Sequence, residues 1–264
     1  MTTSSRLLGV ATVALATLTA LSACTAARID STPPAEVKTT VSAPASAFTV
    51  IADADESAAS LATSRELFDS APVVLIAPSG QPEAQYVAAR AAVSLGVPLL
   101  VSDAGPAAAS TDAPNPSETP SSPGTAGALV GAEVDRLGAS VVVAIGDVED
   151  DDALAGVDGA DAAVVRVDAD AAAVADATGL GVDAGGSGDP AAFTSTIATL
   201  SAGSPERPGT DEIPATTPAA PLTDTVVLAL DSPAQLASVA TARAAGVAVT
   251  LVPGANPNPQ ASPS

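Results

Sequence analysis

The stretch VVLIAPSGQPEAQYVAARAAVSLGVPLLVSD, residues 73–103, holds a complete strand–helix–strand unit. Its two end runs, 73–77 and 97–101, are apolar and rich in aliphatic residues, without the alternation of a half-exposed strand. Such runs predict strands that are covered on both faces, as in a parallel sheet. Between them the apolar side chains recur at helical spacing, and Gly96 stands where a left-handed helix cap belongs.

Short apolar runs of the same kind occur elsewhere in the chain, and helix-length segments separate most of them. These runs are 48–52, 140–145, 162–167, 225–230 and 247–252. Strands that alternate with helices indicate a fold in which helices cover both faces of a mostly parallel sheet. We therefore expect a three-layer α/β fold.

The chain also repeats part of itself. The segment AQYVAARAAVSLGVPLLV begins at Ala84, and its counterpart AQLASVATARAAGVAVTLV begins at Ala234. A second, shorter match precedes these two segments, with VIADAD at 50–55 and VRVDAD at 165–170. Two matches in the same order indicate two repeats of one structural unit.

The repeats define the expected domain organisation. We predict a first α/β repeat over 47–155 and a second, truncated repeat over 160–252. The second repeat lacks a counterpart of GALVGAEVDRLGASVVVAIGD, residues 127–147. Because its last part, 222–252, is too short to hold a core of its own, we expect its two strands to join the sheet formed by the rest of the chain.

Four segments are dense in proline, serine, threonine or alanine. Proline removes backbone donors and stops helices, so these segments are predicted to lie outside the core and to be disordered. They are a stalk over 24–46, an insertion over 104–124, a second insertion over about 203–221, and the tail 253–264.

The N-terminus has the organisation of a bacterial export signal over residues 1–23. One basic residue, Arg6, precedes the run LLGVATVALATLTAL, which has the length of a signal-peptide core and is short for a membrane span. The tetrapeptide LSAC, Leu21–Cys24, then resembles the lipobox of bacterial lipoproteins. The resemblance implies cleavage before Cys24 and its acylation, for example with palmitate, on the outer face of the cytoplasmic membrane. A membrane anchor that holds an inert cysteine is the alternative.

Composition excludes several classes of function. The chain carries 9 basic and 30 acidic residues and no histidine, which gives a net charge of −21. Such a charge repels nucleic acid and anionic lipid headgroups. A Ser-His-Asp triad cannot form without histidine, and Ser79 in APSGQ lacks the Gly-x-Ser-x-Gly frame of a nucleophile elbow. We therefore expect no enzymatic activity and no cofactor.

Polar residues follow several expected strands, at the sheet edge where ligands of open α/β folds gather. Because acids and hydroxyls dominate there, we expect weak envelope binding bridged by a divalent cation, or binding of a protein partner. A competing interpretation assigns four acids to helix caps and first turns, namely Asp53, Asp55, Asp168 and Asp170. The candidate binding residues are Asp53, Asp55, Ser79, Ser102, Asp103, Gly146 and Asp147.

The acidic run GDVEDDD, residues 146–152, follows one of these strands directly. Clusters of carboxylate oxygens hold Ca²⁺ or Mg²⁺, and Ca²⁺ is the cation we would expect here. The candidate metal ligands are Asp147, Glu149 and Asp150. A loop followed by a helix start, where acids interact favourably with the helix dipole, is the competing interpretation.

Two stretches resemble the type 2 cell wall-binding repeat of Gram-positive surface proteins. They are LGVPLLVSD, residues 95–103, and EVDRLGASVVVAIGD, residues 133–147. The resemblance covers most of 48–155 and, more weakly, 162–252. The chain departs from the family pattern with DADESAA and PEAQYVA at two expected helix starts, and with Asp147 in place of a second glycine.

This resemblance implies a non-enzymatic, extracellular protein of the cell envelope. Its expected partners are the membrane, through lipidated Cys24, and a cell-wall polymer or an envelope protein. Two other classes stay open. One is a solute-binding lipoprotein that serves a transporter, and the other is a metal-dependent enzyme that uses the 146–152 loop.

Overall fold

In the computed structural model, the residues that can be described all belong to one compact unit. The described residues are 38–52, 55–102, 123–148, 154, 157, 162–180, 189–202, 210, 213–214 and 216–253, with the backbone alone for 123–127. Five residues singled out above lie outside these ranges. They are Cys24, Asp53, Asp103, Glu149 and Asp150.

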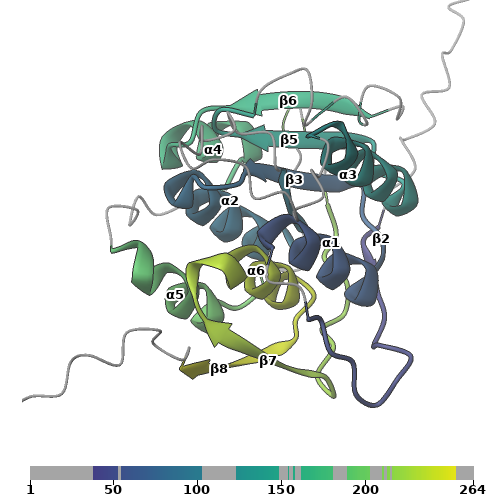
Figure 1. Cartoon of the computed structure of the whole chain (residues 1–264). Helices are drawn as coiled ribbons and strands as arrows, with labels where there is room; N and C mark the ends of the chain where they lie inside the picture. Colours follow the sequence, from purple (N-terminus) through teal and green to yellow (C-terminus); the bar gives the residue numbers. More distant parts are fainter. Residues whose placement is uncertain are drawn as a thin grey trace, which may run out of the picture. The chain divides into compact units, whose positions relative to one another are not determined.

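A four-stranded parallel sheet forms the centre of the fold, as Figure 1 shows. Its strand order is β4-β3-β5-β6, and every neighbouring pair is parallel. The strands are β3 (Val73–Pro78), β4 (Leu99–Ser102), β5 (Val141–Ile145) and β6 (Ala163–Val167). All residues of β3, β4 and β5 are buried, as their continuous apolar sequences predict.

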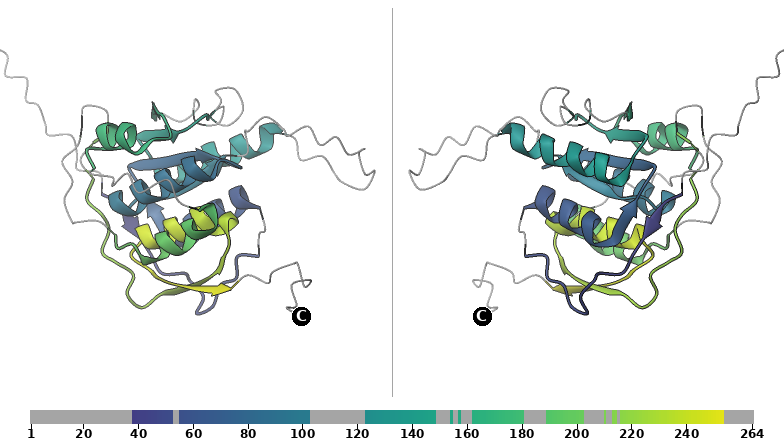
Figure 2. Two further views of the ribbon diagram at one scale, coloured as in Figure 1. Left: turned by 90° about the vertical axis from the view of Figure 1, so that its left-hand side faces the viewer. Right: turned by 90° about the vertical axis from the view of Figure 1, so that its right-hand side faces the viewer.

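Helices cover both faces of this sheet, so the predicted three-layer α/β fold is confirmed (Figure 2). On one face α1 (Glu56–Leu67) and α3 (Pro123–Leu137) pack against Val74 and Ile76. On the other face α2 (Pro82–Leu95) and α4 (Ala171–Thr178) belong to the same core as Leu75. The alternation of β3 side chains between two cores explains why this strand is apolar at every position.

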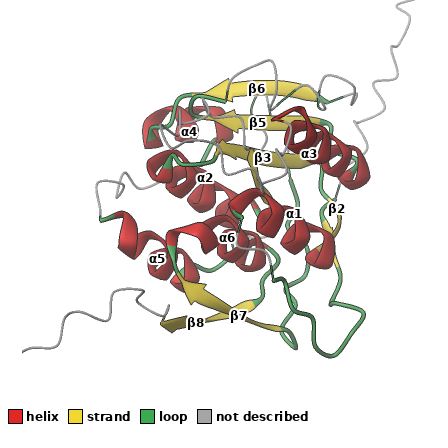
Figure 3. Ribbon diagram, in the orientation of Figure 1, coloured by secondary structure: helices red, strands yellow, loops and turns green. Residues whose placement is uncertain are grey.

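The last two strands were predicted to join the main sheet, and this prediction is wrong. β7 (Val226–Asp231) and β8 (Ala248–Pro253) form a separate two-stranded parallel sheet, visible at the bottom of Figure 3. The strand β6, which opens the predicted second repeat 160–252, extends the main sheet instead. The second repeat is therefore divided between two sheets.

The reason lies in α6 (Leu236–Ala244), which follows the short 3₁₀ helix η2 (Pro233–Gln235) and lies against β4, α1 and α2. α6 occupies the free edge of β4, where a further strand would have to pair. There the Leu99 N–H donates to Thr241 Oγ1 and the Thr241 hydroxyl donates to Leu99 O, both at 3.1 Å. The Val101 N–H donates to Ser60 Oγ at 3.1 Å. Hydroxyl groups thus satisfy backbone groups that a neighbouring strand would otherwise pair.

Two segments depart from the predicted boundaries at the N-terminal side. The stalk was expected to run to residue 46, but β1 (Thr40–Val41) pairs antiparallel with β2 (Phe68–Ser70), and Thr39 is fully buried. The run 48–52, predicted as a strand, forms none, and Phe48 is 79% exposed. A strand needs a paired neighbour, and in the described residues this run has no backbone pairing.

The second proline-rich segment is also partly ordered, contrary to its assignment as a disordered insertion over about 203–221. Thr217 forms an isolated parallel bridge with Lys38, and the side chain of Ile213 is buried in the core. Pro218 and Pro221 contact two glycines that follow helices. Proline density forbids regular ladders here but leaves this segment free to pack on the helices.

These two glycines, Gly96 and Gly246, occupy equivalent places in the two repeats. Both have a positive φ, 68° and 76°, which favours glycine. A Cβ on Gly96 would stand 2.9 Å from Pro218 Cβ, and one on Gly246 would stand 2.6 Å from Pro221 Cα. Both positions therefore need glycine for the turn and for the close contact.

A further pair of helical segments completes the described fold. The 3₁₀ helix η1 (Pro190–Ala192) leads into α5 (Phe193–Thr199), whose Phe193 ring stacks on Tyr86 with centroids 4.1 Å apart. None of the helices in the described ranges is long and apolar enough to span a membrane.

Candidate functional site

The carboxyl ends of β3 and β4 meet at one edge of the main sheet. The Ser79 N–H donates to Ser102 O at 2.8 Å, so the two predicted binding serines are neighbours. Ser79 is half-buried in the turn after β3, and Ser102 is the last residue of β4. Parallel strands place these ends side by side, which is why residues 23 positions apart in sequence come together.

The N-termini of α1 and α2 face this same edge and are linked to it. Gln85 Nε2 donates to Glu56 Oε2 at 2.8 Å and to Pro78 O at 3.0 Å. Gln85 is buried, and its amide therefore joins α2, the start of α1 and the end of β3. No sequence motif pointed to a role for Gln85, apart from its match to Gln235 in the repeat.

Asp55 stands at this edge in a capping role. Its Oδ1 accepts a hydrogen bond from the Ala58 N–H at 2.9 Å, which caps α1. Asp170 caps α4 in the same way, accepting from Ala172 and Ala173 N–H at 2.9 Å each. For these two acids the competing interpretation, that they are helix caps, is confirmed.

Gly146 closes the edge on the β5 side. Its φ is 85°, and its N–H donates to Val167 O at 2.9 Å, which turns the chain after β5. A Cβ here would stand 2.9 Å from Ala84 Cβ and 3.5 Å from Gln81 Oε1, so the backbone lies against the start of α2. Asp147 follows, and its side chain is exposed to solvent.

One buried polar group at this edge has no partner among the described residues. The Ser102 hydroxyl is fully buried and makes no hydrogen bond there. Within the same ranges, no cluster of three or more His, Cys, Asp or Glu side chains could hold a metal ion. Asp147 is the described member of the proposed metal set, and Glu149 and Asp150 lie outside the described ranges. The metal prediction therefore stays a prediction.

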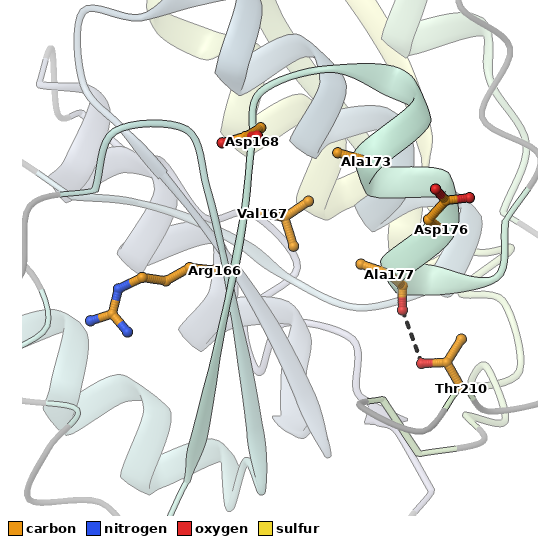
Figure 4. A pocket seen from close by; sticks show the side chains of 7 residues that line it. All are labelled: Arg166, Val167, Asp168, Ala173, Asp176, Ala177 and Thr210. Atoms are coloured by element: carbon orange, nitrogen blue, oxygen red, sulfur yellow. Dashed lines mark hydrogen bonds between the residues drawn. The ribbon is translucent and has the colours of Figure 1, made fainter.

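A cavity of about 510 Å³ opens beside the end of β6 (Figure 4). Asp168 and Asp176 contribute its carboxylates, and the Thr210 hydroxyl donates to Ala177 O at 2.9 Å. Figure 4 shows the Arg166 guanidinium directed away from Asp176 and Thr210, on the other side of the strand. Asp168 had been assigned to a cap or first turn, and here Asp170 takes the capping role while Asp168 lines the cavity.

The sequence did not point to Asp176 or Thr210. Asp176 lies in the middle of an alanine-rich helix, where a single acid usually marks the solvent side. Thr210 lies in a proline-rich segment that was expected to be disordered. Their placement depends on how that segment packs against α4, and local sequence patterns do not encode this.

The buried charge of the fold lies elsewhere, on α3. Glu133 is fully buried and accepts hydrogen bonds from Ser64 Oγ at 2.6 Å, Arg65 Nε at 3.1 Å and Arg136 Nη2 at 2.7 Å. Burial alone would raise the pKa of Glu133. Hydrogen bonds from Arg136, Ser64 and Arg65, together with the positive charge of Arg136, outweigh burial and lower this pKa below its ordinary value. This network joins α1 to α3 and does not face the sheet edge.

A second surface feature was not predicted from the sequence. We call it the apolar groove. It has a volume of about 650 Å³ and lies between segment 43–51, the C-terminal part of α1, and residues 224–229 of the β7 region. In Figure 1 the segment before α1, drawn in purple, passes beside β7. Its apolar lining includes Phe48, Val50 and Leu228.

Comparisons with known proteins assign no family. No family model and no curated protein matches the chain. Among solved structures, the chain is similar to Cwp6 from Clostridium difficile, with 13% identity and a TM-score of 0.43. The match covers 81% of this chain and 45% of the Cwp6 chain, so this protein spans less than half the length of that one. At this level of similarity, the functional assignment depends on the residues of the chain itself.

Proposed function

We propose that this chain is a lipid-anchored, non-enzymatic protein of the cell envelope that binds a wall polymer or another envelope component. The observation that carries the proposal is the tetrapeptide Leu21–Cys24, directly after an apolar run of signal-peptide length. Cys24 is the only cysteine in the chain, so no disulfide competes with its acylation. Two acyl chains would give a stable tether, because one alone binds a bilayer only marginally.

The chemistry of the sheet edge supports binding over catalysis. Ser79, half-buried, is the candidate hydroxyl that solvent reaches there, whereas the Ser102 hydroxyl is fully buried, and the chain has no histidine to activate either of them. The Asp55 carboxylate is engaged in capping α1, whereas Asp147 is exposed. Exposed acids and hydroxyls can bind a cation or accept hydrogen bonds without further chemistry.

The net charge of −21 sets a condition on contact with any anionic wall polymer. The field of surface charges decays over about 8 Å at physiological salt, so repulsion acts mainly at close contact. A divalent cation that binds acidic groups of both the protein and the polymer would remove this repulsion, because hard cations prefer carboxylate and phosphate oxygens. The proposed envelope binding is therefore cation-dependent, with Asp147 as one contributing acid.

The anchor is tested by metabolic labelling of the full chain with a clickable fatty acid. The unchanged chain and Ser22→Ala, which keeps a small residue before the cysteine, should both be labelled and recovered with membranes. Cys24→Ala should be unlabelled, and it should stay uncut or be released. Equal labelling of Cys24→Ala would refute lipid attachment at this residue.

A further inference from the structure

The free edge of β4 in the main sheet is covered, whereas the free edge of β7 in the small sheet is open. On β4, the side chains of Thr241 and Ser60 satisfy backbone groups of the edge, and α6 covers it. β7 pairs with β8 on one side, and among the described residues its other edge makes no backbone hydrogen bond to another strand or segment. An open edge of this kind can accept one more strand.

The open edge of β7 borders the apolar groove. Both strands of this sheet alternate between half-buried and exposed residues, so one face packs on the fold and the other faces solvent. Parallel sheets are normally covered on both faces, and the outer face here is apolar. The exposed apolar residues of this face and of the groove are Phe48, Val50, Ile51, Val226, Leu228, Leu230 and Val252.

The size of this exposed surface favours a bound partner. Phe48 is 79% exposed, Leu228 68% and Val50 66%, and each lines the groove. Five of the seven exposed apolar residues line the groove itself, and apolar side chains gathered in this way mark sites of interaction.

The charge around the groove indicates which partner fits. Its charged lining residues are Glu66 and Asp224, both acidic. No lysine or arginine among the described residues lines the groove, and four of the described arginines are engaged within the fold. Arg65 and Arg136 bind Glu133, Arg243 donates to Leu200 and Val247 carbonyls, and Arg90 lies over the Tyr86 ring. Among the described residues, the groove lining therefore combines apolar area with two acids and no base, which favours a basic partner.

We infer that the apolar groove binds an extended, basic and apolar segment of a partner protein, which adds as a strand to the open edge of β7. Strand addition uses main-chain hydrogen bonds for affinity and alternate side chains for specificity. Apolar side chains of the segment would cover Phe48 and Leu228, and basic ones would reach Glu66 and Asp224. A second copy of this acidic chain, or an anionic bilayer, would bring like charges to the same rim.

This inference concerns a different surface from the sheet edge and does not depend on cation-mediated polymer binding. The two can be separated by their response to EDTA, which removes divalent cations. Strand addition at β7 should not change on chelation, whereas polymer binding should be lost.

Synthetic peptides test the inference on the full chain in mild detergent, with fluorescence anisotropy as the readout. The probe is an acetylated seven-residue peptide that alternates lysine and valine. One control has the same sequence with alternate backbone amides N-methylated, which keeps charge and side chains but blocks strand pairing. The other alternates glutamate and valine. The first peptide should bind at least about tenfold more tightly than either control.

Variants locate the contact. Leu228→Ser should weaken binding of the first peptide about tenfold, because it removes apolar area at an exposed position. Val252→Ser, on the same face but outside the groove lining, should leave binding within about twofold. The double change Glu66→Gln with Asp224→Asn should weaken binding more than the matched pair Glu83→Gln with Asp135→Asn, two exposed acids outside the groove lining.

Three outcomes would overturn the inference. Equal binding of the N-methylated peptide would exclude strand addition. A concentration-dependent dimer in sedimentation velocity, lost in Leu228→Ser, would show that a second copy occupies the groove. Binding to phosphatidylglycerol vesicles that is lost in the same variant, while no peptide binds, would show a membrane contact instead.

Discussion

Thr241 and Leu99 are 142 residues apart in sequence, and the Thr241 hydroxyl is within 3.1 Å of both the amide nitrogen and the carbonyl oxygen of Leu99. One side chain of α6 thus satisfies both backbone groups of a buried residue on the edge of β4. This contact fastens the C-terminal repeat to the main sheet without adding a strand to it.

Replacing Thr241 by valine should destabilise the fold by about 1–3 kcal/mol, because it leaves the Leu99 N–H and C=O buried without partners. Ser238→Ala is the matched control, since this buried hydroxyl on the same helix has no partner among the described residues. We expect the control to change stability by less than about 0.5 kcal/mol. Urea denaturation of the two variants measures the difference, and equal destabilisation would show that the Thr241 hydroxyl has no special role.

The ordered proline segment leads to a second prediction. Gly246→Ala combines strain from a positive φ with a clash against Pro221, whereas Gly138→Ala has a φ of 64° and nothing within 4 Å of the added Cβ. The Gly138 change should cost about 1 kcal/mol and the Gly246 change at least 1–2 kcal/mol more. Thermal denaturation compares them, and equal midpoints would mean that Pro221 moves aside without cost.

The Glu133 network makes stability depend on pH. Its folded-state pKa is lowered, so the network stabilises the fold above the unfolded pKa of about 4.3, and this contribution is lost as the pH falls through the lower folded value. Glu133→Gln should therefore lower stability at pH 7 by about 1–3 kcal/mol, because Arg65 and Arg136 lose their partner.

The difference between the unchanged protein and Glu133→Gln should shrink as the pH falls from about 4.3 through the lower folded pKa, below which the carboxyl group is protonated in both states. Asp135→Asn, an exposed acid on the same helix, is the control and should show no such convergence. Denaturant titrations at pH 7 and in acid would reveal the pattern. A gap that stays constant with pH would contradict the assigned charge of Glu133.

The main sheet could be predicted because each of its central strands carries its own evidence. Val73–Pro78 and Val141–Ile145 are apolar at every position, as expected of strands in a parallel sheet covered on both faces, and all residues of both are buried. The end of α2 could be predicted from Gly96 alone, because glycine is the residue that favours the left-handed cap conformation observed there. Local signals of this kind need no knowledge of the rest of the fold.

The arrangement of the second repeat could not be predicted, because it depends on competition for one edge. The sequence 225–230 reads as a strand and is one, but whether it pairs with β4 is decided by Thr241 and Ser60 on two helices. The run 48–52 was predicted as a strand because its residues are apolar. It forms none, since no other segment of the described residues pairs with its backbone. Of the predicted edge residues, Ser79 and Ser102 meet as expected because parallel strands end together.

Co-sedimentation of the full chain with purified cell walls tests cation-dependent contact with the cell envelope. The protein in mild detergent is spun with walls in the presence of Ca²⁺ and again after chelation with EDTA, and Asp147→Asn is run alongside. We expect the protein to pellet with Ca²⁺, Asp147→Asn to pellet less, and both to stay in the supernatant with EDTA. Protein that remains in the supernatant under both conditions, or pellets equally under both, would contradict cation-dependent contact.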